Sequence, residues 1–136
     1  MSKRSLSWPI GAYRPNVLSE RGGFVQDMPR YVGPLSEPVA LGSLVEWQED
    51  SVVSKTLVKR GGGNITAFAF AAGQGLSEHT APFDAMVVAV EGQGEITLEG
   101  CTRTLENGQA FLMPAGVPHS VMAREAFKML LIMIKA

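Results

Sequence analysis

The stretch from Gly73 to Ala123 constrains the fold of this chain more than any other part of it. Short apolar segments alternate there with Gly, Asn and Pro, and Asn107–Gly108 is a strong hairpin signal. The stretch also carries both histidines of the chain, His79 and His119. Short strands separated by tight turns are typical of all-β sandwiches and barrels. The sequence therefore predicts an all-β fold, in which the two histidines begin strands of different hairpins and could point into one cavity.

Strands are predicted within that stretch and on both sides of it from β-branched and apolar patterns. The expected strands are 51–59, 65–72, 85–91, 95–99, 101–105, 110–113, 119–123 and 127–135. The last segment also fits a short helix by periodicity, but its length and position favour a strand. Residues 41–50 fit either a brief strand or a turn. Because closing a sheet removes its exposed edges, we expect a barrel or a double-sheet jelly roll.

Residues 1–38 differ from the rest of the chain. They hold five of the eight prolines and show no sustained period of either regular structure. Aromatic side chains such as Trp8 and Tyr31 argue against complete disorder, since they usually find a surface to pack on. We therefore expect an N-terminal arm over 1–38, extended or partly disordered, followed by a barrel domain over 39–136.

Charge and composition narrow the function. The chain has 12 basic and 13 acidic residues and a formal net charge of -1, which argues against nucleic acid or a membrane surface as a partner. The single cysteine, Cys101, excludes an intrachain disulfide and fits a reducing compartment. No secretory signal is evident and no apolar run is long enough to span a bilayer, so we expect a cytoplasmic protein.

The spacing of glycine, proline and histidine resembles the two motifs of small single-domain cupins. The matching positions are Gly73, His79 and Gly92 in the first motif and Gly108, Pro114, Gly116 and His119 in the second. The resemblance covers about residues 41–136, and the stretch GLSEHTAPFDA is similar to an uncharacterised subgroup. It implies an RmlC-like, double-stranded β-helix barrel that assembles as a homodimer. In metal-binding cupins, three histidines and one glutamate hold Fe, Mn, Ni, Zn or another divalent ion.

Three positions of these motifs hold alanine here. Ala81 stands at the second histidine, Ala85 at the glutamate and Ala123 at the asparagine that ends the second motif. The resemblance thus implies only His79 and His119 as metal ligands, fewer than the three protein ligands typical of catalytic zinc. Asp84 could complete the set if a bulge turned it inward. Cys101 could also do so, although a structural thiol is the commoner interpretation.

The apolar strands favour a barrel that encloses a small molecule. The side chains expected to line it are Phe68, Phe70, Met86, Val88 and Met113, with His79 and His119 orienting a polar group of the ligand. One alternative is a divalent-metal-dependent enzyme, similar to cupin dioxygenases or isomerases. Another is a metal-free enzyme in which His79, His119 or Asp84 acts as a general acid or base. A barrel that serves only as a scaffold is the third.

Overall fold

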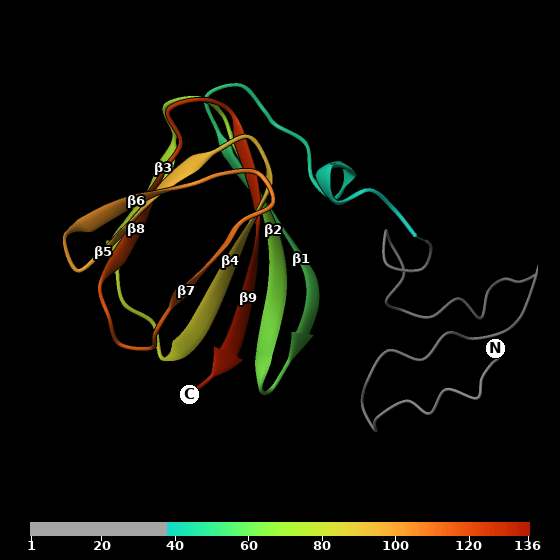
Figure 1. Ribbon diagram of the computed structural model, residues 1–136. Helices are drawn as coiled ribbons and strands as arrows, with labels where there is room; N and C mark the ends of the chain where they lie inside the picture. Colours follow the sequence, from blue (N-terminus) through green and yellow to red (C-terminus); the bar gives the residue numbers. More distant parts are fainter. Residues whose placement is uncertain (1–37) are drawn as a thin grey trace, which may run out of the picture. The chain divides into compact units, whose positions relative to one another are not determined.

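The computed structural model describes residues 38–136 as two antiparallel β-sheets (Figure 1). The expected N-terminal arm lies, except for Pro38, outside the described residues. The elements are η2 (Leu41–Ser43), β1 (Val52–Arg60), β2 (Gly63–Phe70), β3 (Gly75–His79), β4 (Phe83–Glu91), β5 (Gly94–Leu98), β6 (Cys101–Leu105), β7 (Ala110–Met113), β8 (His119–Met122) and β9 (Phe127–Lys135). No helix in this part of the chain is long and apolar enough to cross a membrane.

The strands form a five-stranded sheet in the order β1-β2-β9-β4-β7 and a four-stranded sheet in the order β3-β8-β5-β6. Only the β1–β2 and β5–β6 connections stay within one sheet. Every other connection crosses between the sheets, so most neighbouring strands come from distant parts of the sequence. Residues 127–135 form a strand paired on both sides, with β2 and β4, and not a helix. The predicted all-β jelly roll is therefore confirmed.

The inner faces of the two sheets, which face each other, hold the main core. Its largest fully buried side chains are Phe70, Phe127, Ile96, Met129 and Val87. The Phe70 and Phe127 rings stack with centroids 5.9 Å apart. Gly94 lies against the Phe127 ring so closely that a β-carbon there would come within 2.5 Å of it. These aromatic contacts close the barrel at the end where β9 begins.

A second apolar cluster covers part of the outer face of the five-stranded sheet. Leu44 and Val45, just after η2, pack there with Ala67 and Ala69 of β2. Beside them the buried Lys128 ammonium donates a hydrogen bond to the Gly42 carbonyl at 2.6 Å. Residues 40–47 are therefore attached to the barrel by apolar burial and by a cation.

Lys128 is buried because several groups on its neighbours replace its hydration. Carboxylate oxygens of Glu46 and Glu91 lie 3.6 and 3.5 Å from its Nζ. The Trp47 ring centroid lies 4.4 Å from the same atom, within range of a cation–π interaction. The Trp47 indole N–H in turn donates to the Phe127 carbonyl at 3.3 Å.

The rest of this outer face is apolar and partly exposed. Leu112, Met86 and Ile132 are register partners across β7, β4 and β9. Leu112 is 59% exposed and Met86 41%, and Ile134 nearby is 61% exposed. We refer to these four residues as the outer apolar row.

Candidate functional site

The structure brings the two histidines together. His79 is the last residue of β3, His119 is the first of β8, and the two are register partners across this antiparallel pair. Their ring centroids are 4.4 Å apart and their planes meet at 68°. His119 is 6% exposed, whereas His79 is exposed to solvent. The expectation that both histidines begin strands was wrong for His79, because residues 75–79 form a separate strand, β3, that ends at His79.

Each imidazole is oriented by the backbone of its own strand. Nδ1 of His79 lies 2.7 Å from the Ser77 carbonyl oxygen, and Nδ1 of His119 lies 2.9 Å from that of Val117. A carbonyl oxygen only accepts hydrogen bonds, so Nδ1 carries the proton in both rings. The Nε2 atoms, on the far side of each ring, make no hydrogen bond to any protein group within residues 38–136.

The inward row that contains the histidines crosses the whole four-stranded sheet. Its register partners, from β3 to β6, are His79, His119, Leu98 and Cys101. This row lies at the end of the barrel where β4 begins and β7 ends. There Gly116 N–H donates to the Ala81 carbonyl at 2.9 Å, which holds the β7–β8 and β3–β4 connections side by side.

The facing row of the five-stranded sheet at this end carries a charge only on the edge strand β1. From β1 to β7 its register partners are Lys59, Asn64, Met133, Ala85 and Met113. Several inward apolar side chains that pack on the core are only half-buried, unlike those at the Phe127 end. These are Phe68, Phe111, Leu131, Met133, Leu76 and Leu98. The inner faces are therefore partly accessible to solvent.

Three of the five apolar residues expected to line the interior point into it. Phe68, Phe70 and Met113 all belong to or pack on the core between the sheets. Met86 and Val88 do not, because β4 presents the buried Ala85, Val87 and Ala89 inward and the residues between them outward. The expectation for these two was wrong: a continuous apolar strand contains no alternation that would reveal which face is inward.

Asp84 does not turn toward the histidines. It is paired in regular register with Ile134 on β9, with no bulge between Phe83 and Ala89. Its side chain is exposed, and its Oδ1 accepts a hydrogen bond from the Ala115 N–H at 2.9 Å. The inward slip that would have made it a ligand or a partner of the histidines is absent. Asp84 instead fixes the turn that leads into β8.

Within the part of the chain that the structure describes, the side chains do not complete a divalent-metal site of the cupin kind. Among residues 38–136, no three His, Cys, Asp or Glu side chains come together in a group that could hold an ion. Cys101 shares the inward row but is exposed and lies two strands away from His119. Two imidazoles are fewer ligands than catalytic zinc sites use.

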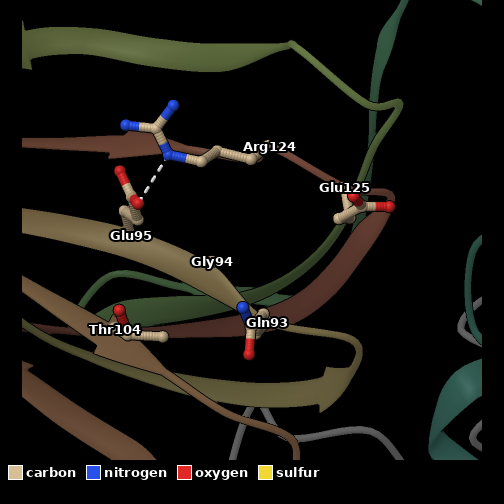
Figure 2. Close-up of a pocket in the computed structure, with 6 residues that line it drawn as sticks. All are labelled: Gln93, Gly94, Glu95, Thr104, Arg124 and Glu125. Carbon is tan, nitrogen blue, oxygen red and sulfur yellow. Dashed lines mark hydrogen bonds and ion pairs between the residues drawn. The ribbon is translucent and has the colours of Figure 1, made fainter.

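A second feature, which the sequence did not indicate, lies at the other end of β5. Figure 2 shows a small polar hollow there, lined by Gln93, Gly94, Glu95, Thr104, Arg124 and Glu125. Arg124 Nε donates to Glu95 at 2.7 Å across it, and this hydrogen bond, followed by the carboxylate charge, raises the pKa of Arg124. The hollow has room for little more than ordered water, so it is not the candidate site.

Comparison with known proteins establishes the family. The family model for the cupin domain matches residues 67–135, and the chain therefore belongs to the cupin family. A conserved protein of unknown function from Streptococcus pyogenes is 40% identical, with a TM-score of 0.71 over 74% of this chain and 89% of that one. A cupin superfamily protein from Desulfitobacterium hafniense is 29% identical, with a TM-score of 0.72 over 76% of this chain and 94% of that one.

A more distant solved structure shares only the fold. Salicylate 1,2-dioxygenase from Pseudoaminobacter salicylatoxidans shares the fold at a TM-score of 0.58 and 20% identity, over 61% of this chain and 25% of that one. At that identity the likeness concerns the fold alone. The search of curated proteins found no match to this chain.

Proposed function

We propose that this cupin binds a small molecule between its sheets, at the end of the barrel where His79 and His119 lie. The observation that carries the proposal is the buried imidazole of His119, whose Nε2 has no protein partner within residues 38–136 although the side chain is 6% exposed. Buried polar atoms in proteins are nearly always hydrogen-bonded. A bound molecule would supply the partner.

The surroundings support a ligand with an apolar body. Phe68, Met113 and Met133 face inward from the five-stranded sheet, and Phe68 and Met133 retain solvent access. Ligand sites in proteins are mostly apolar, with a few polar groups that fix orientation. His79 and His119 would be those polar groups here.

Methionine methyl groups provide a direct test of this location. In ¹³C-methyl-methionine protein, a binding compound is expected to shift the Met113 and Met133 signals, because both side chains face inward. Met86 and Met122 are 41% and 43% exposed and serve as internal controls. A compound that shifted only the controls, or a chemically diverse fragment library that shifted no inward methyl, would refute the proposal.

A metal-dependent reaction is the alternative that the family suggests, but no observation in this structure favours it. His79 and His119 alone do not make up the ligand set, and Asp84 is engaged with the Ala115 N–H. We therefore propose binding and derive no step through a metal. A metal-free acid–base role for the histidines would require a substrate first shown to bind there.

We further propose that the protein is a homodimer, as its family resemblance suggests. The support is the outer apolar row, in which Leu112, Met86 and Ile134 are each more than 40% exposed. Apolar side chains clustered on one exposed face favour association. A second copy would cover them.

A further inference from the structure

We propose that the head group of the ligand is a hydrogen-bond donor, of which a primary ammonium is the simplest, held between Nε2 of His79 and Nε2 of His119. This inference rests on the proposed function and specifies the chemistry of the same site. It follows from the placement of two protons and from the spacing of two rings.

The proton positions are fixed by the main chain. Nδ1 of His79 and of His119 each donates to a carbonyl two residues earlier, at 2.7 and 2.9 Å. With Nδ1 as the donor, the Nε2 of a neutral imidazole has a free lone pair and no proton. Both rings therefore offer acceptors to a ligand.

The two acceptors are close enough for one head group. The ring centroids are 4.4 Å apart, and the rings extend from register partners on adjacent strands. Neither neutral Nε2 can donate to the other, so the pair cannot satisfy itself. An –NH₃⁺ group carries three donors, enough to serve both acceptors, whereas a carboxylate has only acceptors and offers no donor to a neutral ring.

The rows around the histidines are apolar or uncharged except on the edge strands. From β3 to β6 the row continues from the histidines through Leu98 to Cys101, and the facing row is Asn64, Met133, Ala85 and Met113. The facing row continues past Asn64 to the exposed Lys59 on the edge strand β1, and the next inward row of the other sheet ends at the exposed Arg103 on the edge strand β6. Both cations lie on edge strands, whereas the histidine row itself contains no lysine or arginine. Lys128 is on the outer face of its sheet, and Arg124 is paired with Glu95.

The test compares small molecules that share an apolar group and differ in their polar head group. Benzylamine, benzyl alcohol and benzoate, with n-butylamine, n-butanol and butyrate as a smaller series, would be titrated into EDTA-treated protein at pH 8. The affinity is read from the Met113 and Met133 methyl shifts. We expect the amine to bind about tenfold or more tightly than the carboxylate in at least one series, and the alcohol to fall between them. Imidazole ¹⁵N spectra should show Nε2 of both histidines shifting with the amine.

His79→Leu is the first variant, because this side chain is exposed and its removal spares the core. We expect it to reduce the preference for amine over carboxylate to about threefold or less while the alcohol still binds. His119→Leu should do the same, and its amide spectrum checks that it is folded.

A carboxylate that binds as tightly as the amine, or a preference that survives both variants, would overturn the inference but leave the proposed function standing. Failure of every probe to shift an inward methyl, together with failure of the fragment library, would overturn both.

Discussion

His79 and His119 face each other across β3 and β8, and each turns its Nδ1 toward the backbone of its own strand. The Nδ1–carbonyl distances of 2.7 and 2.9 Å mean that the main chain, and not a neighbouring side chain, selects the tautomer. Two histidines that are far apart in the sequence thus leave their Nε2 atoms unbonded at the same end of the barrel.

The tautomer itself can be measured. At pH 8, long-range ¹H–¹⁵N spectra are expected to show both imidazoles protonated on Nδ1, because only a donor can bond the Ser77 and Val117 carbonyls. A histidine in an unfolded sample of the same protein is the internal reference. Protonation on Nε2 in either residue of the folded protein would contradict the geometry and remove the basis for an acceptor pair.

Metal content distinguishes the binding and metal-enzyme hypotheses. Protein purified without an affinity tag is expected to lose its divalent metal on dialysis against EDTA, with Tm changed by less than about 2 °C, since two imidazoles bind weakly. The His79→Ala/His119→Ala variant is the control. About one equivalent of Fe, Mn, Ni or Zn retained in the wild type and absent from the variant would show that a further ligand completes the site.

Gly94 tests how the barrel is closed. In Gly94→Ala, the added carbon would lie 2.5 Å from the Phe127 ring, so we expect the free energy of unfolding to fall by about 1–3 kcal/mol. Gly61→Ala is the matched control, because a β-carbon there meets nothing within 4 Å. Urea denaturation measures both. Equal stability of the two variants would mean that Phe127 is not packed as described.

Lys128 tests how residues 40–47 are attached. Lys128→Met removes the donor to Gly42 and leaves Glu91 without its cation, and we expect a loss of about 1–2 kcal/mol because Glu46 and Glu91 keep much of their hydration. Lys55→Met, at an exposed position of β1, is the control. The measurement is the denaturation midpoint in urea. A Lys128→Met variant as stable as the control would show that apolar burial alone holds this segment.

The outer apolar row tests the proposed assembly. The Met86→Glu/Leu112→Glu variant places two charges on the face that a second copy would cover, and it is expected to elute as a monomer under conditions where the wild type is a dimer. Light scattering coupled to gel filtration gives the mass. Thr102→Glu, on an exposed strand of the other sheet, should leave the mass unchanged. Unaltered dimerisation of the double variant would place the interface elsewhere.

Much of the fold was predictable because the turn chemistry is local. Asn107–Gly108 and Gly92 mark turns by their own conformational preferences, and both glycines adopt positive φ, at 87° and 79°. The pairing of β3 with β8 could not be predicted in the same way. It joins segments some forty residues apart, and nothing near Gly75 specifies its partner.

Of the candidate site, only the meeting of His79 and His119 could be predicted from the sequence. The inward direction of β4 depends on packing against β9 and the opposite sheet, so Met86 was placed on the wrong face. The position of Asp84 depends on a hydrogen bond with Ala115, in a distant turn. The attachment of Trp47 to Lys128 likewise joins residues that no local pattern relates.

The contact between Gly94 and Phe127 has a kinetic consequence. Because this contact closes one end of the barrel, a molecule held near the histidines would enter and leave by the same route. Changes in the turns around Ala81 and Gly116, which are joined by a hydrogen bond at that end, would therefore alter the rates of entry and release together.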